Sequence, residues 1–233
     1  MFKQLFDEAT STLTYLIADD VTKKAVIIDA VSEHIDDYLL LIEQHGLKLQ
    51  YALETHVHAD HITAGGELRR RLGAQVGVGE QCGAVCADIQ LNDGDVLSFG
   101  EEQITVIATP GHTAGSVSFL WRNQLFTGDA LLINGCGRTD FQNGDAGMLF
   151  DSIVNELFVL PNETLVYPAH DYQGHRVSNI AQEKLINPRL ANKTKAEFIA
   201  IMTKLNLPKP RLIDIAVPAN QYCGLPESCT LQG

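Results

Sequence analysis

Residues 56–61 carry the densest set of metal-binding side chain types in the chain and read His-Val-His-Ala-Asp-His. Imidazole nitrogens and carboxylate oxygens are ligands that zinc, iron and manganese share. Side chains two residues apart on an extended segment point to the same side, so His56 and His58 can face one ion. Asp60 and His61 begin the following turn and can face a neighbouring position. The segment therefore predicts a metal centre.

Three further candidate ligands, His112, Asp129 and His170, each follow an apolar segment. Loops carry function while strands fix position, so ligands at several strand ends can build one metal site. Seven candidates exceed the four ligands of one tetrahedral ion, which favours a two-metal hydrolytic site. The same set contains the two-His, one-carboxylate group of non-haem iron enzymes. The residues alone do not decide between a two-metal hydrolytic site and a non-haem iron site. The lack of Cys ligands argues against a purely structural metal site.

Short apolar segments separated by turns must position these side chains. Strands are expected at residues 13–18, 24–29, 49–55, 75–78, 103–107, 116–120, 125–127 and 164–167. Helices are expected after Ser32 as far as Gly46, at 67–72, at 146–158 with Asp145 as N-cap, and after the capping box at Thr194. Strands interleaved with helices without strict alternation indicate mixed sheets with helices outside. We expect one domain over residues 1–233 with a helical C-terminal end from about residue 176.

Composition and charge exclude several classes of protein. The 17 basic and 29 acidic residues give a net charge of −12, which argues against a nucleic acid partner. No apolar stretch approaches the length of a membrane span, and residues 1–8 lack the apolar run of a signal peptide. Of the five Cys, only Cys82 and Cys86 are close in sequence. We expect reduced thiols and a cytoplasmic location.

The candidate ligands resemble a known family in their order and spacing. Residues 56–61, 111–113, 128–129 and His170 are similar to the metal-binding motifs of the metallo-β-lactamase superfamily, over about residues 10–175. This resemblance implies an α+β fold, the αββα sandwich, in which two mixed sheets pack face to face with helices on the outer faces and metal at one edge. Four further segments look like the persulfide dioxygenase (sulfur dioxygenase, ETHE-type) branch, from residue 2 to about 224: 137–142, 167–172, 187–189 and 217–220.

The branch implies an oxidoreductase with one Fe(II) per chain, held by His56, His112 and Asp129. It would oxidise glutathione persulfide with O2 and water to sulfite and glutathione, and homodimers are common in it. The remaining candidates would surround these ligands and hydrogen-bond them or the metal-bound water: His58, Asp60, His61 and His170.

Glutathione carries carboxylates, so cations or hydroxyl groups are expected near the metal. The candidates are Arg138, Tyr172, Arg176 and Arg189. Arg138 has an alternative role, in which it holds Asp140 or a backbone carbonyl. Cys223 lies where the resemblance also places a Cys, and a redox or glutathionylation role and an ordinary free thiol are both open for it.

The main alternative is a hydrolase of glutathione thioesters similar to glyoxalase II. It would use all seven candidate ligands to hold two ions of zinc, iron or manganese. Residues 137–142 and the compact C-terminal end look instead like the dioxygenase branch, which makes persulfide oxidation the favoured interpretation.

Overall fold

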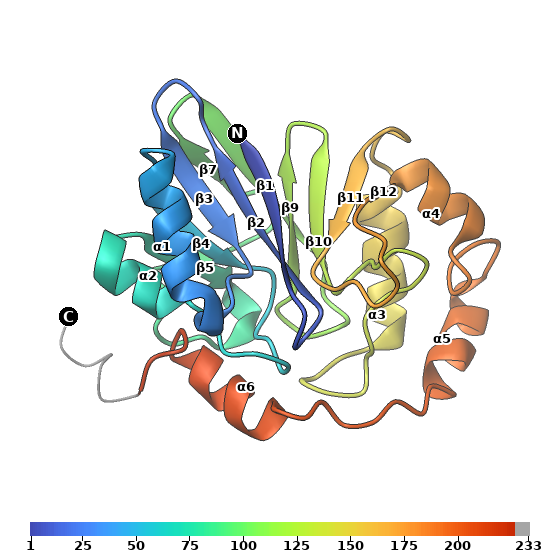
Figure 1. Cartoon of the computed structure of the whole chain (residues 1–233). Helices are drawn as coiled ribbons and strands as arrows, with labels where there is room; N and C mark the ends of the chain where they lie inside the picture. Colours follow the sequence, from blue (N-terminus) through green and yellow to red (C-terminus); the bar gives the residue numbers. More distant parts are fainter. Residues whose placement is uncertain (227–233) are drawn as a thin grey trace. The chain divides into compact units, whose positions relative to one another are not determined.

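The computed structural model describes residues 1–226, which divide into two compact units (Figure 1). Unit 1 comprises Met1–Leu91, Val96–Gln103 and the residues from Lys209 onward. Unit 2 comprises Asn92–Asp95 and Ile104–Pro208. Each unit is described by itself below.

Unit 1 contains a six-stranded sheet in the order β1-β2-β3-β4-β5-β6. Its strands are β1 (Phe2–Asp7), β2 (Thr12–Ala18), β3 (Lys24–Ile28), β4 (Lys48–Glu54), β5 (Gln75–Gly79) and β6 (Ile89–Leu91). The first three strands pair antiparallel, and β3 to β6 pair parallel. All of β2 is buried, which agrees with its run of apolar and β-branched residues. The parallel strands bring their carboxyl ends to one edge of the sheet.

Two helices cover one face of this sheet (Figure 1). The 3₁₀ turn η1 (Ser32–His34) leads into α1 (Ile35–Gln44), and α2 (Gly65–Leu72) follows β4. Tyr38 and Ile42, one helical turn apart, are the buried residues of α1 and pack in the same core cluster as Leu16 and Ile27 of the sheet. A second 3₁₀ turn, η2 (Glu80–Cys82), follows β5.

The second sheet has the strand order β12-β11-β10-β9-β8-β7. Its strands are β7 (Val96–Phe99), β8 (Glu102–Ala108), β9 (Val117–Trp121), β10 (Gln124–Gly128), β11 (Leu165–Pro168) and β12 (Ser178–Asn179). The pairs β8–β9, β9–β10 and β11–β12 are antiparallel, whereas β10 and β11 are parallel. The sheet is therefore mixed.

The helices of unit 2 begin at the N-caps that their sequences supply. The Asp145 carboxylate accepts the Met148 N–H at the start of α3 (Ala146–Asp151), which continues as the π-helical turn η3 (Ser152–Leu157). Asn179 caps α4 (Ile180–Ile186), and the capping box of Thr194 opens α5 (Lys195–Thr203). These helices share a buried apolar cluster with β10 and β11, whose members include Leu125, Leu149, Val166, Ile180 and Phe198.

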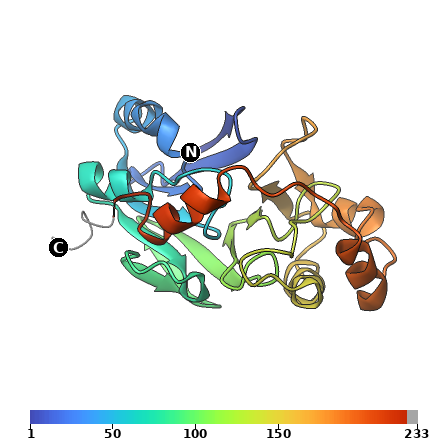
Figure 2. The same cartoon turned by 90° about the horizontal axis from the view of Figure 1, so that it is seen from below.

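Helix α6 (Ile213–Gln221) returns the chain to unit 1. Figure 2 shows it beside the segment that links β4 to α2, and hydrogen bonds between the two are described below. None of the helices within residues 1–226 is long and apolar enough to cross a membrane.

The predicted elements are present within a few residues of their expected bounds, whereas β1, β6, β7 and β12 were not predicted. Helices α4 and α6 lie in the expected helical C-terminal end, but their bounds were not predicted. The expectation that all thiols are reduced is wrong: Cys86 and Cys223 form a disulfide with their Cα atoms 6.1 Å apart. Because 137 residues separate the two in sequence, spacing gave no sign of the pairing. Cys82 and Cys136 form no disulfide within residues 1–226, and Cys229 lies outside the described residues.

Candidate metal centre

The His-rich segment forms the loop between β4 and α2 in unit 1. The imidazoles of His56, His58 and His61 are buried, with ring centroids 4.1 Å apart for the first two and 4.3 Å apart for the last two. Asp29, directly after β3, accepts the Thr55 backbone N–H at 2.7 Å and the Thr55 hydroxyl at 2.9 Å. The loop is thereby fastened to the carboxyl edge of the sheet at its first residue.

One hydrogen bond determines which nitrogen of His56 can act as a metal ligand. The Thr55 hydroxyl donates to Asp29, so its oxygen accepts from Nδ1 of His56, 3.0 Å away. With the proton on Nδ1, the lone pair of the neutral ring is on Nε2. A partner on the second ring nitrogen is the usual arrangement of a metal-binding imidazole.

His58 is held by two buried carboxylates. Its Nε2 lies 3.1 Å from Asp29 and 3.3 Å from Glu54. Burial alone would lower the pKa of His58, but the charge and hydrogen bond of Asp29, together with Glu54, raise it to about 10. Burial raises the pKa of Glu54. The three side chains therefore form a charged cluster beneath the loop.

The loop carries two buried ring nitrogens that have no hydrogen-bond partner within residues 1–226, Nδ1 of His58 and Nε2 of His61. The other nitrogen of His61 lies 2.8 Å from the Asp60 carboxylate. Buried polar atoms without partners are rare in proteins, and an ion or ordered water is a common explanation. Nε2 of His61 therefore fits a cation or metal-bound water as an acceptor, while the protonated Nδ1 of His58 can donate to a water.

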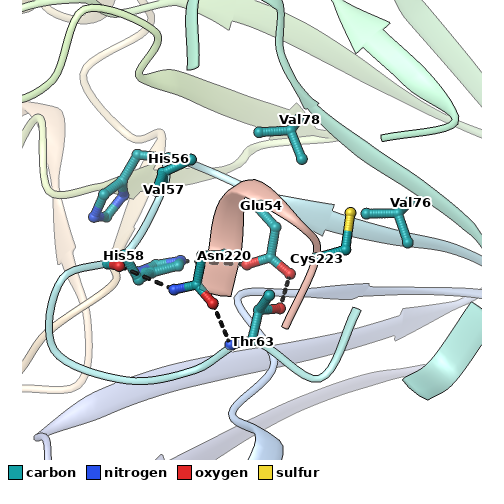
Figure 3. A pocket seen from close by; sticks show the side chains of 9 residues that line it. All are labelled: Glu54, His56, Val57, His58, Thr63, Val76, Val78, Asn220 and Cys223. Carbon is teal, nitrogen blue, oxygen red and sulfur yellow. Dashed lines mark hydrogen bonds and ion pairs between the residues drawn. The ribbon is translucent and has the colours of Figure 1, made fainter. Parts of the chain in front are cut away.

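A cavity of about 10 Å³ lies below the loop (Figure 3). It is lined by Glu54, His56, Val57, His58, Thr63, Val76, Val78, Asn220 and Cys223. The Thr63 hydroxyl donates to Glu54, and the Asn220 side chain spans the loop from Thr63 to His58. A cavity of this size holds about one water molecule.

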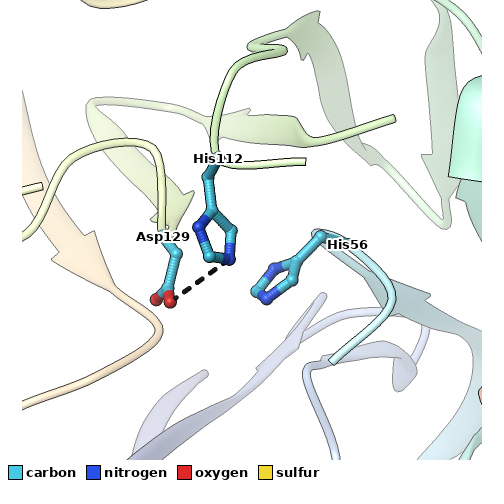
Figure 4. A group of neighbouring side chains, drawn as sticks. All are labelled: His56, His112 and Asp129. Carbon is cyan, nitrogen blue, oxygen red and sulfur yellow. Dashed lines mark ion pairs between the residues drawn. The ribbon is translucent and has the colours of Figure 1, made fainter. Parts of the chain in front are cut away.

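In unit 2, His112 and Asp129 form the second group of candidate ligands (Figure 4). Nδ1 of His112 donates to the Arg138 carbonyl at 2.7 Å, which leaves the lone pair on Nε2. That lone pair lies 3.5 Å from the Asp129 carboxylate, so two acceptors face each other. The other Asp129 oxygen accepts from Nδ1 of His170 at 2.6 Å. The arrangement is complementary to a bound cation.

Gly137 permits the close packing behind His112. Its N–H donates to the Asp129 carbonyl at 2.7 Å. A Cβ on this residue would lie 2.7 Å from Nδ1 of His112 and would also meet the Asp129 carbonyl oxygen. The glycine in the segment 137–142 is therefore required by the geometry of two candidate ligands.

The residues predicted to bind substrate differ in what they contact. Arg138 forms two hydrogen bonds with Asp140, at 2.6 and 2.7 Å, and donates to the carbonyls of Leu207 and Pro208. Its alternative role as a structural residue is therefore present in the structure. Arg189 donates to the Cys136 carbonyl at 2.6 Å.

Arg176 and Tyr172 are more exposed. Arg176 lies 3.6 Å from the Asp171 carboxylate, and its side chain is 42% exposed. The ring of Tyr172, a residue that is 69% exposed, stacks on His170 with centroids 5.6 Å apart. Tyr172 therefore presents a hydroxyl-bearing ring next to a candidate site residue of unit 2. Substrate binding by these four residues stays a prediction.

Three buried residues of the site were not predicted from sequence. Asp29 and Glu54 end buried strands, which was the available signal, and Asn220 lies in the segment 217–220, to which the resemblance assigned no role. All three act through contacts with residues that are distant in sequence or with the His-rich loop.

Comparison with known proteins assigns the family. The model of the metallo-beta-lactamase superfamily matches residues 8–81 and 87–170, and the chain belongs to this superfamily. The predicted fold class, α+β with two mixed sheets, is confirmed by the two six-stranded sheets and by the solved relatives.

The resemblance to the persulfide dioxygenase branch is also confirmed. The chain is 48% identical over 228 residues to "Persulfide dioxygenase ETHE1, mitochondrial" of Mus musculus and 47% identical to the protein of that name from Homo sapiens; each alignment covers 97% of this chain and 89% of the relative. The crystal structure of ETHE1 from Myxococcus xanthus matches with a TM-score of 0.95 and 54% identity, covering 97% of this chain and 100% of that chain.

Proposed function

We propose that this chain is a persulfide dioxygenase that converts glutathione persulfide, O2 and water into glutathione and sulfite. The observation that carries the proposal is the 48% identity to a persulfide dioxygenase along 97% of the chain. The reaction balances with two protons released, because both atoms of O2 and one oxygen of water end in sulfite. We propose no membrane or nucleic acid partner for this reaction.

We propose that one Fe(II) is held by His56, His112 and Asp129, the ligand set that the resemblance implies. Both imidazoles have their Nδ1 engaged by an acceptor, Thr55 for the first and the Arg138 carbonyl for the second. Each therefore offers Nε2 as a ligand, and the set is the two-His, one-carboxylate group of non-haem iron enzymes. When bound, the iron supplies the electrons that the activation of O2 requires.

The residues around the ligands hold them and their water. His170 donates to Asp129 and fixes the orientation of that carboxylate. His58 and His61 each have one buried ring nitrogen that can hydrogen-bond to water, as a donor in protonated His58 and as an acceptor in His61, whose ring Asp60 orients. We propose that these four residues position water rather than bind the iron directly.

Glutathione recognition is proposed for the cationic and hydroxyl side chains predicted from sequence. The guanidinium groups of Arg138 and Arg189 already donate to protein carbonyls. Tyr172 and Arg176 are therefore the more accessible candidates for contact with the carboxylates of the peptide. Arg138 and Arg189 would contribute positive charge nearby.

Oxygen consumption tests the proposal directly. Anaerobically iron-loaded protein is placed in an oxygen electrode with glutathione persulfide, and in parallel it is assayed on S-lactoylglutathione. We expect O2 uptake matched by sulfite, lost in His56→Ala and Asp129→Ala and kept in the control His45→Ala, whose side chain is exposed on the helix surface. Thioester hydrolysis without O2 uptake would reject the dioxygenase.

The hydrolase similar to glyoxalase II is the second candidate, and one observation favours it. Ligand atoms of His58, Asp60 and His61 lie within 4.8 Å of one another and could hold a second ion. Two metals per chain by elemental analysis, together with hydrolysis of the thioester, would support this candidate. One iron per chain would support the dioxygenase.

We further propose a homodimer, which sedimentation analysis would test. A cytoplasmic location stays a prediction from the sequence, while the relatives from mouse and human are named mitochondrial.

A further inference from the structure

The side chain of Asn220, near the end of α6, makes three hydrogen bonds to the His-rich loop. Its Nδ2 donates to the carbonyl of His58 at 2.9 Å and to the carbonyl of His61 at 2.8 Å. Its Oδ1 accepts the Thr63 backbone N–H at 2.9 Å. The residue is only 4% exposed, so water does not compete readily for these bonds. One amide group thus satisfies three backbone groups of the loop. Figure 3 shows its bonds to His58 and Thr63.

The residues after Asn220 pack closely against the end of the loop and the start of α2. No space is left there for a side chain at Gly66 or Gly224. The Gly66 N–H donates to the Cys223 carbonyl at 2.8 Å, and a Cβ on Gly66 would meet that carbonyl and the Leu225 side chain. Gly224 has a φ of +77°, and a Cβ there would meet the Thr63 carbonyl oxygen. Both glycines are therefore required for this close contact.

A covalent bond fixes the same segment in place. Cys223, three residues after Asn220, is bonded to Cys86, which lies between β5 and β6 of the same sheet. Asn220 is thus held between helix α6 and a disulfide, and its side chain is fully used by hydrogen bonds to the loop.

We propose that Asn220 is a positioning residue of the metal centre, which holds the imidazoles of the His-rich loop in binding geometry through the backbone carbonyls of His58 and His61. The identity of the metal and of the reaction rests on the proposed function, whereas the positioning role concerns the loop alone. A side chain that orients ligands without touching the metal typically changes metal affinity or activity by about 10–100-fold.

Two substitutions separate the parts of this role. Asn220→Ala removes all three hydrogen bonds. Asn220→Asp has almost the same shape and keeps the acceptor for the Thr63 N–H, but it places a carboxylate oxygen against the two carbonyls. Asn206→Ala is the matched control, because Asn206 is exposed and lies outside the loop.

The first measurement is amide hydrogen exchange at Thr63 in the metal-free protein, followed by NMR. We expect fast exchange in Asn220→Ala and slow exchange, as in the parent, in Asn220→Asp and Asn206→Ala. The second measurement is the affinity for Zn²⁺, determined by competition with a chromophoric chelator. We expect binding weaker by at least about tenfold in both Asn220 variants and unchanged binding in the control.

The proposal fails if Asn220→Asp, folded by circular dichroism, binds Zn²⁺ within about twofold of the parent. If Asn220→Ala does not fold, the aspartate variant carries the test alone. Iron-loaded Asn220→Asp should also lose kcat for glutathione persulfide with little change in KM, because Asn220 is buried and its side chain bonds the loop backbone. A parent protein that binds metal without oxidising persulfide would reject the proposed function, while weaker metal binding in the variants would still support positioning.

Discussion

The disulfide between Cys86 and Cys223 makes a quantitative prediction about stability. It joins residues 137 positions apart, so it removes a large amount of conformational freedom from the unfolded chain. The entropy relation for a loop of this size gives about 5 kcal/mol, and measured values are usually about 2–4 kcal/mol. We therefore expect reduction or Cys86→Ser to lower the free energy of unfolding by about 3 kcal/mol. In a chain of this length that corresponds to a fall in Tm of about 6–12 °C.

The assay compares urea unfolding of the metal-free protein with and without a phosphine reductant, alongside Cys86→Ser. Cys82→Ser is the matched control, since Cys82 lies four residues from Cys86 and forms no disulfide in the described part of the chain. Thiol titration in denaturant should find two fewer thiols before reduction than after it. Reductant should not change the stability of Cys86→Ser.

Equal thiol counts before and after reduction would refute the pairing itself. A second outcome would contradict the predicted effect on stability. A disulfide that is present by titration but whose reduction shifts Tm by less than about 1 °C would refute the argument from the unfolded chain.

Three further predictions concern the fold around the site. The hydrogen bond to Asp7, with a second to Asp37, raises the pKa of His34. This stabilisation is present below pH 6.5 and is lost as the pH rises through the folded-state pKa. His34→Ala should therefore lower the free energy of unfolding in urea more at pH 6 than at pH 9, by no more than about 1 kcal/mol at this partly exposed pair. Equal losses at both pH values would contradict the prediction. Thr194→Ala removes the capping box of α5 and should cost about 1 kcal/mol in urea unfolding, whereas no loss would mean that tertiary contacts alone hold this helix. Leu149→Ala opens a cavity in the fully buried cluster of unit 2 and should cost about 2–5 kcal/mol by the same method, with a loss below 1 kcal/mol showing that the cluster closes around the gap.

Local signals account for the elements that were predictable from sequence. The helix after Ser32 has apolar residues at helical spacing, and α3 and α5 have capping residues that the structure confirms. Strands β2 and β3 are mainly apolar runs rich in β-branched residues. In each case the information lies within about ten neighbouring residues, which is the range that periodicity and capping reach.

The elements that were missed depend on distant partners. Strand β12 has two residues and β6 has three, too few for a period to be recognised. Helix α6 contains Pro218, which argues against a helix in the sequence. Its place is fixed by the hydrogen bonds of Asn220, whose partners lie up to 162 positions earlier.

Part of the candidate site was likewise predictable from sequence, and part of it was not. His56, His58, Asp60 and His61 were found because they are adjacent in sequence and chemically unusual together. By contrast, the hydrogen bond from Nδ1 of His112 to the Arg138 carbonyl joins residues 26 positions apart, so it could be identified only in the folded structure. The residues that support a metal site can therefore be identified only from the tertiary structure, even where the ligands themselves are recognisable in the sequence.

Unit 1 is built from segments on both sides of unit 2 in the chain, which matters for how the protein is made. A chain is synthesised from its N-terminus, and domains fold as they emerge. Strands β1 to β6 and the His-rich loop leave the ribosome before any residue from Lys209 onward has been translated. The loop gains the hydrogen bonds of Asn220, and Cys86 gains its bond to Cys223, only after all of unit 2 has been synthesised. Metal offered to the nascent chain would meet an unsupported loop, so the centre matures late, after translation has passed the residues that hold it.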